Sequence, residues 1–530
     1  MPKTVTRSRE FLQKRRNYPK EIARKRKMHY NHGKFSRFPC CGGTGKTDVP
    51  FCGKGCSGMR EGKYNTEIVP IQGQTLQATP PRQTEENDIA VPGVNGRHLY
   101  LSEETLSKHL LALGSIGSGK TNGLLHIVGA LSERMGSRDR MILFDAKGDY
   151  EAEFYRPGDK ILGRKAEEGG MVWNLFCDLM EDPNGPLDEE MLRQIATTLF
   201  AEQIERSQNP TFPRGARDLF VGLTIAFVQE KQQQGMASWE TLNNRDLKAF
   251  FCSSVSTPDS IQEKISQHPN LQWMKMYLLA PKSATTQSYL APLQEAVNEL
   301  FIGCFAQKGS FSIRRFIAQG GQDRLFIAYD PEYGCLMDAM YTVLLDLAMR
   351  QAIGHRARNG GSIYFCLDEL PMIPALTYLD QLLNFGRSLG IKIVAGIQNV
   401  SQLREKYGDF RASSILSGFS TMLCFHLFDV ESRELVRQRH GKALCRINSL
   451  NQNGRDNSEK IEEMDVIRDW DIVGLEKGHC VVSLPTGEPF LFSPTVYPKR
   501  DVTTQQACHQ EPSARPEREI ILKVHRVTHQ

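Results

Sequence analysis

The chain has 530 residues, of which 40% are hydrophobic and 24% charged, and its 66 Lys and Arg against 61 Asp and Glu give a formal charge of +5. These proportions are ordinary for globular proteins and exclude a mainly disordered, collagen-like or small disulfide-stapled chain. The longest apolar stretches, such as residues 219–228, are about half the ~20 residues that a membrane-spanning helix needs. We therefore expect a buried helix there, no transmembrane helix, no secretory signal and a cytoplasmic location.

The positive charge is concentrated in residues 1–60, which hold 16 Lys or Arg and only 3 Asp or Glu, a local charge of +13. The remaining residues therefore sum to −8. Aromatic residues such as Phe11, Tyr18 and Tyr30 are interleaved with the basic ones. Such arms attract polyanions, because each neutralised phosphate releases counterions. A nucleic-acid or anionic-lipid contact and a solvated tail without a partner both stay open.

Most of the 13 cysteines stand singly in apolar stretches, as Cys366, Cys424 and Cys480 do, which predicts buried free thiols in a reducing compartment. Four others crowd among glycines: Cys40, Cys41, Cys52 and Cys56. Together with His29 and His32 they are candidate ligands of a Zn²⁺ ion. The usual C-x₂-C spacing is absent, so coincidence and redox chemistry are the alternatives.

The first half of the chain changes its pattern twice. Residues 61–96 are polar and predict a linker or short irregular strands. Between 97 and 180, apolar runs at 109–113 and 141–144 alternate with helical patterns, as in βαβ units with a parallel sheet. From 182 to 310 apolar residues recur at helical spacing without strand-like runs, which predicts an all-α insertion.

The strand pattern then resumes. Runs typical of strands occupy residues 325–329, 363–367, 391–397 and 421–427, and a long helical pattern covers 336–353. Near the end, 480–484 and 490–492 flank Pro485-Thr486-Gly487, which predicts a β-hairpin.

A phosphate-binding loop is the strongest motif. It fits G-x-x-x-x-G-K-[ST] at every fixed position and consists of Gly114, Ser115, Ile116, Gly117, Ser118, Gly119, Lys120 and Thr121. An apolar strand precedes it and an amphipathic helical pattern follows. The glycines let the backbone wrap the phosphates, and the N–H groups of the helix N-terminus supply positive charge. We expect Lys120 to reach the β- and γ-phosphates of ATP and Thr121 to bind Mg²⁺.

Acidic and polar residues follow the later strands. Asp368 and Glu369 end the run 363–367, at the edge of a parallel sheet where ligands bind. We expect Asp368 to act in the Mg²⁺ shell and Glu369 on the attacking water. Gln398 ends the next strand and is placed to sense the γ-phosphate or orient water. Arg387, near a helix end, either neutralises charge on a neighbouring subunit's ATP or stabilises its own helix C-terminus.

The acidic segment 145–149 follows the strand at 141–144 and predicts a solvated turn beside the same edge.

With these segments assembled, the sequence resembles the conjugative coupling proteins of type IV secretion systems, the TraD/TrwB-like ring ATPases related to the FtsK/HerA translocases. The matching segments run in family order: GSIGSGKT (114–121), FDAKGDY (144–150), WNLF (173–176), FPRGARDLF (212–220), FSIRRFI (311–317), FCLDEL (365–370) and GRSLGIKIVAGIQNVSQLREKYG (386–408).

This resemblance implies an α/β fold: a RecA-like P-loop NTPase parallel sheet with helices on both faces, plus an inserted all-α domain. The expected divisions are a basic arm (1–60), the first part of the nucleotide-binding domain (61–181), the all-α domain (182–310), the second part of the nucleotide-binding domain (311–500) and a polar tail (501–530).

The resemblance also implies an ATP-driven DNA translocase that works as a homo-hexamer and delivers relaxase-bound DNA to a type IV secretion channel. It assigns Arg387 as a finger acting on a neighbour and Gln398 as a sensor. Family members commonly begin with transmembrane helices, where this chain has a basic arm, so we expect a peripheral position at the inner membrane. The alternatives are a HerA/FtsK-like DNA-processing motor without a secretion role and a nucleotide-switched cargo adaptor.

Overall fold

The computed structural model describes residues 65–500, apart from 82–87, 165–166, 168, 279–282, 331–333, 355–360, 374 and 451–456. The basic arm with its cysteine cluster (Cys40, Cys41, Cys52 and Cys56) and the tail 501–530 lie outside these residues. Among the helices that are described, none is both long and apolar enough to cross a membrane.

A nine-stranded sheet organises the described part of the chain, in the order β14-β13-β10-β4-β9-β8-β5-β7-β6. The seven strands from β10 to β6 are mutually parallel, and β13 and β14 add an antiparallel hairpin at one edge. The strands are β4 (Leu110–Leu113), β5 (Arg140–Asp145), β6 (Lys160–Leu162), β7 (Arg324–Ala328), β8 (Ile363–Leu367), β9 (Ile391–Ile397), β10 (Thr421–Cys424), β13 (Cys480–Ser483) and β14 (Phe490–Phe492).

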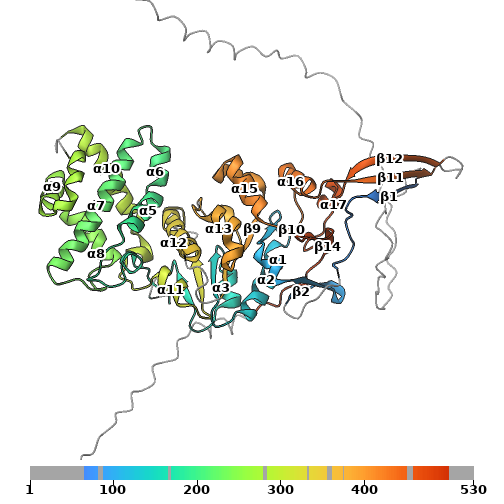
Figure 1. Ribbon diagram of the computed structural model, residues 1–530, viewed down its shortest axis with the longest axis horizontal. Helices are drawn as coiled ribbons and strands as arrows, with labels where there is room; N and C mark the ends of the chain where they lie inside the picture. The colour runs from blue at the N-terminus through green and yellow to red at the C-terminus, as the bar shows by residue number, and fades with distance from the viewer. Residues whose placement is uncertain are drawn as a thin grey trace, which may run out of the picture. The chain divides into compact units, whose positions relative to one another are not determined.

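Both faces of this sheet are covered by helices. In β5, Ile142 and Phe144 join one core cluster, whereas Met141 and Leu143 join the other. The first cluster includes α12 (Gly334–Gly354), α13 (Leu379–Phe385), α14 (Val400–Tyr407) and α15 (Asp409–Gly418), and the second includes α1 (Glu103–Ser107), α2 (Lys120–Arg134) and α3 (Asp149–Phe154). Continuous apolar strands are typical of a sheet buried on both sides. The expected parallel sheet with helices on both faces is thereby confirmed (Figure 1).

Between β6 and β7 the described chain forms helices and no strand beyond an isolated bridge, Trp173 to Phe311. Figure 1 draws most of this segment in green. Its α-helices are α4 (Leu175–Leu179), α5 (Glu189–Leu199), α6 (Ala201–Arg206), α7 (Thr211–Gln233), α8 (Asn244–Ala249), α9 (Pro258–Gln267), α10 (Ala284–Leu300) and α11 (Ile313–Gln319). Shorter turns of 3₁₀ or π type are η3 (Phe250–Ser254), η4 (Pro269–Tyr277) and η5 (Gly303–Ala306). Residues 219–228 are all buried in α7, as expected; the boundaries at 182 and 310 stay a prediction.

The chain enters and leaves this helical segment at one joint. The backbone N–H of Asn174 donates to the carbonyl of Phe311 (3.0 Å). The buried carboxylate of Asp178 accepts from Trp173 Nε1 (2.6 Å), Ser312 Oγ (2.7 Å) and the backbone N–H of Arg314 (2.8 Å). One acid thus ties Trp173 of the segment WNLF to Ser312 and Arg314 of the segment FSIRRFI.

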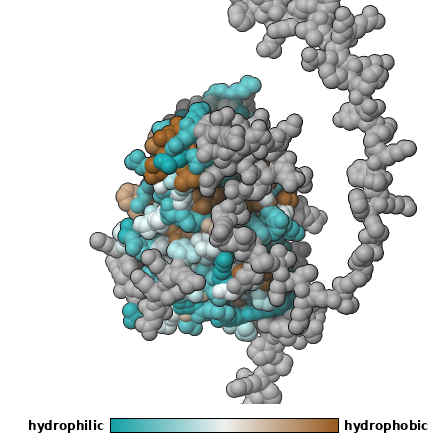
Figure 2. Space-filling model, turned by 90° about the vertical axis from the view of Figure 1, so that its right-hand side faces the viewer, coloured by the Kyte–Doolittle hydropathy of each residue, from teal (hydrophilic) through white to brown (hydrophobic). Residues whose placement is uncertain are grey.

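Two smaller sheets differ from expectation. β1 (Asn65–Gln72) is a strand of eight residues, paired antiparallel with β11 (Lys442–Leu450) with a register shift between Pro70 and Gln72, and β11 in turn pairs with β12 (Asn457–Asp465). Much of this sheet is exposed, with Val69 39% and Ile461 55% exposed, whereas Ala443 and Cys445 of β11 are buried. Figure 2, which views this end, shows apolar areas in brown among hydrophilic teal ones. Because so few of its residues are buried, this sheet gives no clear alternation of apolar and polar residues in the sequence.

The other small sheet pairs β2 (Ile89–Pro92) with β3 (His98–Leu101), and its apolar residues pack into the same core cluster as α2. The remaining elements are η1 (Val94–Gly96), η6 (Leu370–Met372), η7 (Gly386–Leu389), α16 (Val430–His440) and α17 (Asp469–Val473). β8 and β9 match their expected ranges, and the hairpin of β13 and β14 is confirmed. The expected strand 421–427 is too long, because β10 ends at Cys424.

The Asp178 joint predicts a stability effect. Asp178→Ala leaves several buried donors without an acceptor, which costs about 3 kcal/mol or more, so we expect the melting temperature to fall by several degrees. Glu181→Ala, at an exposed side chain nearby, should leave it unchanged. Thermal unfolding followed by circular dichroism measures both. Equal melting temperatures for the two variants would contradict the importance of the joint.

Candidate active site

Three neighbouring strands of the central sheet end side by side. β9 pairs in parallel with β4 on one side, where Leu113 aligns with Ile397, and with β8 on the other, where Leu367 aligns with Ala395. Carboxyl ends of parallel strands meet at one edge of the sheet, which is where ligands bind in such folds. The phosphate-binding loop, Asp368-Glu369 and Gln398 follow these three strand ends directly.

The phosphate-binding loop requires its glycines for steric reasons. Gly119 precedes α2 with φ of 103°, and a Cβ there would lie 2.7 Å from Cα of Gly478. A Cβ on Gly114 would lie 2.6 Å from Ser118 Oγ. L-residues rarely adopt such a positive φ, so no larger residue fits at Gly119. The loop therefore brings α2, beginning at Lys120, to the end of β4.

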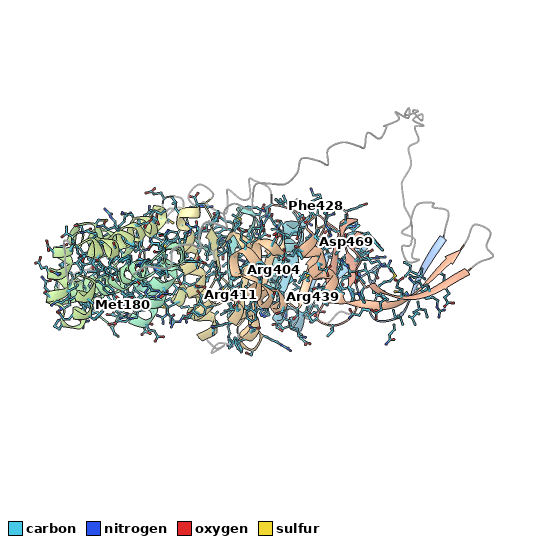
Figure 3. All side chains as sticks on the ribbon, turned by 90° about the horizontal axis from the view of Figure 1, so that it is seen from above. Met180, Arg404, Arg411, Phe428, Arg439 and Asp469 are labelled. Carbon is cyan, nitrogen blue, oxygen red and sulfur yellow. The ribbon has the colours of Figure 1, made fainter. Side chains whose placement is uncertain are left out.

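The segment after β10 holds the loop from one side, a contact that the sequence analysis missed. The backbone N–H of Ser115 donates to the carbonyl of His426 (3.0 Å), and Ser115 Oγ accepts from the N–H of Phe428 (3.1 Å). The His426 and Phe428 rings lie edge to face, with centroids 4.6 Å apart. Phe428 itself is 73% exposed (Figure 3). No local motif marks these residues, because the contact joins loops more than 300 positions apart.

Lys120 and Gln398 both contact the same carboxylate oxygen of Glu369. Lys120 Nζ lies 3.3 Å from Glu369 Oε2, and Gln398 Nε2 donates to the same oxygen at 3.0 Å. Lys120 is 6% exposed and Glu369 3% exposed. A buried carboxylate is stable as an anion only when it is paired and hydrogen-bonded. The three residues thus form one charge-compensated group, assembled from three strand ends.

Asp368 lies beside this group without being satisfied by it. It is buried, and its Oδ1 finds no hydrogen-bond partner among the described residues. Burial raises the pKa of Asp368, and the nearby ammonium groups of Lys120 and Lys147 oppose that shift. Ser118 Oγ, in the loop, is likewise buried without a partner. The site therefore has a carboxylate oxygen and a hydroxyl that make no hydrogen bond to a described residue.

These orphaned atoms fit a hydrated Mg²⁺ ion. Mg²⁺ in nucleotide sites is bound by one or two protein oxygens, several waters and the phosphates. Asp368 and the hydroxyl of Thr121, which is half-buried in the first turn of α2, supply that chemistry. The described residues contain no cluster of three or more His, Cys, Asp or Glu that could hold a metal ion.

The segment 145–149 is not a wholly solvated turn, so that prediction is wrong for Asp145. Its side chain is 3% exposed and accepts from the backbone N–H groups of Glu151 (2.8 Å) and Lys147 (3.4 Å). Burial raises the pKa of Asp145 to about 6. Lys147 and Gly148 are exposed, as expected. The strand β5 neighbours β8, which puts the carboxylates of Asp145 and Asp368 at the same edge.

Arg387 lies away from the other candidate residues. It belongs to η7, which precedes the amino end of β9, whereas Gln398 follows the carboxyl end. Seven strand residues span about 20 Å. Arg387 lies at the amino ends of the parallel strands, and its own phosphate-binding loop lies at their carboxyl ends. Its side chain is 60% exposed, with Nη2 3.6 Å from Glu104 Oε1. This geometry leaves the guanidinium accessible to another molecule and remote from the site of its own chain.

The cysteine predictions have two outcomes. Cys366, Cys424 and Cys480 are buried free thiols, as expected. The candidate zinc ligands Cys40, Cys41, Cys52 and Cys56 lie outside the described residues, so the zinc site stays a prediction.

The chain matches a family of known proteins over most of its length. Residues 98–491 match the family described as the type IV secretion-system coupling protein DNA-binding domain. Coupling protein TraD of Escherichia coli (strain K12) is 20% identical over 454 residues, which cover 81% of this chain and 58% of TraD. The chain thus spans little more than half the length of that relative.

Solved structures of the bacterial conjugative coupling protein TrwB have a similar fold. The unbound monoclinic form of TrwBdeltaN70 has a TM-score of 0.64 at 18% identity, covering 81% of this chain and 94% of that one. TrwB in complex with ADP and Mg²⁺ has a TM-score of 0.62 at 17% identity, covering 84% and 99%. The complex with the ATP analogue ADPNP gives 0.63 at 18%, covering 82% and 96%. The α/β fold of the P-loop NTPase class is thereby confirmed.

The buried carboxyl of Asp145 predicts a pH effect. Because its folded pKa of about 6 exceeds the ordinary value, the folded chain takes up a proton that the unfolded chain does not. This stabilisation is complete below about pH 4 and is lost as the pH rises through about 6. Asp145→Asn does not titrate, so the stability of wild type relative to Asp145→Asn should fall by about 2 kcal/mol between pH 4 and 7. Melting temperatures of both proteins across this range measure it; a difference independent of pH would contradict the assignment.

Proposed function

Because the chain belongs to the family of type IV secretion-system coupling proteins, we propose that it is an ATPase that moves DNA. The observation that carries this proposal is that Lys120 and Gln398 both contact Glu369 Oε2. Beside them, Oδ1 of Asp368 has no hydrogen-bond partner among the described residues. A triphosphate needs a cation at the phosphates, a metal-binding oxygen and a base for water, all within one small space. These residues provide each of them.

ATP binds with its phosphates on the loop 114–121. Gly114, Gly117 and Gly119 allow close approach of the backbone, Ser115, Ile116 and Ser118 complete the loop, and Thr121 and Asp368 hold Mg²⁺. When bound, Mg²⁺ neutralises charge that develops on the phosphate oxygens. TrwB has been solved with ADP and Mg²⁺ and with ADPNP, which supports this choice of ligand.

The ion pair between Lys120 and Glu369 suggests how the base is released. Lys120 exchanges Glu369 for the β- and γ-phosphates, since their oxygens carry more charge than one carboxylate. Glu369 then keeps only the hydrogen bond from Gln398, and its Oε2 has room to accept a proton from the attacking water. Gln398 follows β9 directly, and its hydrogen bond holds the Glu369 carboxylate in position. Through this bond, a change at the γ-phosphate is passed to a central strand of the sheet.

Arg387 completes the site of a neighbouring subunit. Its side chain is exposed at the amino ends of the strands, whereas its own phosphate-binding loop lies at their carboxyl ends. Only another copy of the chain therefore brings it close to a phosphate. A closed homo-hexamer satisfies this geometry in every subunit. DNA passes through its centre and is held mainly through phosphates, with little dependence on sequence.

In this assembly, residues 61–181 and 311–500 form the nucleotide-binding domain and 182–310 form an all-α domain. The motor delivers relaxase-bound DNA to the channel of a type IV secretion system. The family match supports this role, because it covers residues 98–491 and includes both halves of the nucleotide site. The basic arm 1–60 supplies charge for DNA or for the inner-membrane surface.

Single substitutions separate binding from hydrolysis. Lys120→Ala should remove both ATP binding and turnover. Glu369→Gln keeps the hydrogen bond of Gln398 but loses the base, so ATP should bind and turnover should fall by about 10²-fold or more. Glu153→Gln, at a buried glutamate that accepts from the N–H of Arg500, is the matched control and should retain activity. Phosphate release with and without DNA, at two salt concentrations, measures all three. Wild-type turnover in Glu369→Gln, or turnover indifferent to DNA at low salt, would refute the proposal.

The trans role of Arg387 predicts complementation. Arg387→Ala should lower turnover by roughly 10³-fold, and the exposed control Arg245→Ala should not. Mixing inactive Arg387→Ala with inactive Lys120→Ala should restore part of the activity, because some interfaces then combine an intact Lys120 with an intact Arg387. Native mass spectrometry verifies that the subunits mix. Mixed assemblies that stay inactive would show that the arginine does not serve a neighbour.

A further inference from the structure

His109, which directly precedes β4, has an unusual backbone. Its φ is 61°, and among the described residues it is the one residue other than glycine with a positive φ. Its side chain is buried, at 1% exposure. A side chain makes this conformation uncommon, and residues held in it are concentrated at functional sites. The contacts of the ring indicate what His109 does there.

The ring of His109 closes one end of the sheet. The N–H of Ile393 in β9 lies one residue before the pairing of β9 with β4 begins, and His109 Nδ1 accepts from it (3.2 Å). In a neutral ring the proton is then on Nε2. Burial lowers the pKa of His109 to about 4, and the carbonyl groups of Leu383 and Leu382 oppose that shift. The ring is thus neutral near pH 7 and lies against the second half of α13.

The same ring lies against the start of η7. A Cβ on Gly386 would lie 3.3 Å from His109 Cε1 and 3.2 Å from Ile391 Cβ, which is closer than side chains usually pack. Glycine therefore lets η7 approach the ring. Arg387 is the next residue of η7, and its exposed guanidinium is the group assigned to a neighbour's ATP. The histidine thus supports the backbone from which Arg387 extends.

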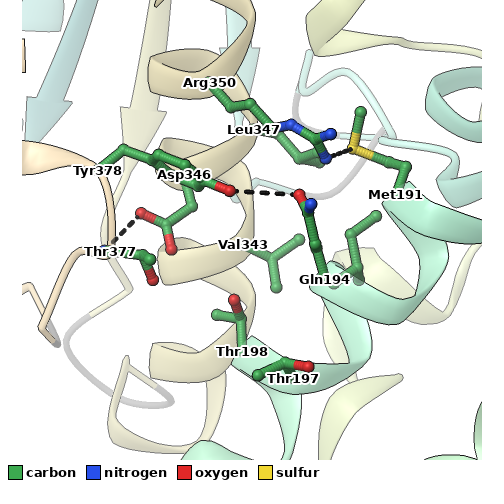
Figure 4. Close-up of a pocket in the computed structure, with 11 residues that line it drawn as sticks. Met191, Gln194, Thr197, Thr198, Val343, Asp346, Leu347, Arg350, Thr377 and Tyr378 are labelled. Carbon is green, nitrogen blue, oxygen red and sulfur yellow. Dashed lines mark hydrogen bonds between the residues drawn. The ribbon is translucent and has the colours of Figure 1, made fainter. Parts of the chain in front are cut away.

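The helix that leads into η7 is also fixed at its other end. Thr377 and Tyr378 directly precede α13, which continues into η7. Asp346 of α12 accepts from the N–H of Thr377 (2.8 Å). Tyr378 donates to Gln194 Oε1 of α5 (3.2 Å) (Figure 4). With the start of α13 tied in this way, the contact with the histidine ring sets where α13 ends and where η7 lies.

α1 adds a weaker contact at the same end of the sheet. Its Glu104 Oε1 lies 3.6 Å from Arg387 Nη2, and its Glu103 Oε1 lies 2.7 Å from Nζ of Lys392 in β9. The side chains of both acids are more than half exposed, so these ion pairs contribute little. The buried ring of His109 is therefore the stronger support.

We propose that His109 is a positioning residue for Arg387, which fixes η7 against β4 and β9 so that the guanidinium reaches the ATP of a neighbouring subunit. This role rests on the proposed function, since Arg387 must act on a neighbour. An apolar side chain would fill the same space, but it would leave the N–H of Ile393 without an acceptor and would adopt a positive φ less readily. A misplacement of about 1 Å can lower turnover about 10²-fold, so a contact at the base of Arg387 is enough to control it.

His109→Asn separates the two contacts of the ring. Asparagine adopts a positive φ readily, and its amide oxygen can accept from the N–H of Ile393, but it leaves the space beside Gly386 empty. We expect ATP affinity to stay near that of wild type and turnover to fall by about tenfold or more. His268→Asn, at a buried histidine of the helical segment, is the matched control and should retain wild-type turnover.

Mixing of variants assigns the defect to the arginine. When His109→Asn is mixed with Lys120→Ala, turnover per intact loop should rise, because the Lys120→Ala subunits bring a well-placed arginine to the loops of His109→Asn. A mixture of His109→Asn with Arg387→Ala should show no rise, since neither subunit brings one. Phosphate release by the mixtures measures both, and native mass spectrometry verifies the mixing. A fault in folding or in the variant's own ATP site would not be rescued by Lys120→Ala.

Gly386→Ala covers the case in which His109→Asn fails to fold. Its Cβ pushes η7 away from the ring, so it should show the same pattern in the mixtures. The proposal is overturned if the folded variant turns over ATP as wild type does, if Lys120→Ala does not rescue it, or if His268→Asn loses as much turnover.

The mixtures also tell two failures apart. If Arg387→Ala and Lys120→Ala do not complement each other, the proposed function of Arg387 fails, and the role of His109 is overturned with it. If those two complement each other but Lys120→Ala does not rescue His109→Asn, the role of His109 alone is overturned.

Discussion

One carboxylate oxygen, Oε2 of Glu369, accepts from both Lys120 and Gln398, and the arrangement of the candidate site depends on this shared contact. It exists because β9 lies between β4 and β8, so that the loop, the acidic pair and the amide follow adjacent strand ends. Because all three side chains are buried or half-buried, each needs the others to compensate its charge or polarity. A change of sheet order would separate them, whatever their sequence.

The same edge of the sheet concentrates negative charge away from water. Asp145 and Asp368 are buried there, and burial raises the pKa of each. Such an edge is held together by cations: the ammonium groups of Lys120 and Lys147, and, in the proposed function, Mg²⁺ with its phosphates. Carboxyl groups with shifted pKa values cluster at functional sites, and in the proposed function the bound metal would offset the free energy that burying them costs.

The sequence predicts some elements of the fold better than others, and the reasons are physical. β8 and β9 were found with their full ranges because they are continuous apolar runs, buried on both faces. The loop 114–121 follows from glycine sterics, which are local. β1 was missed because it pairs with β11 about 380 positions away, and β11 and β12 were missed because most of their residues are exposed and show no clear alternation. Asp145 was misjudged for a similar reason, since its burial depends on the chain around it. The hold of His426 and Phe428 on the loop is also a contact between distant segments.

The central claim is that Lys120 leaves Glu369 for the phosphates of ATP when Asp368 and Thr121 hold its metal. A structure of the full chain with ADPNP and Mg²⁺, by crystallography or electron cryomicroscopy, tests this claim directly. The account predicts Lys120 Nζ within hydrogen-bonding distance of the phosphates, the metal beside Thr121 and Asp368, and Glu369 still bonded to Gln398. A nucleotide bound elsewhere, or one bound at the loop with Lys120 still paired to Glu369 and the metal remote from Asp368, would contradict it.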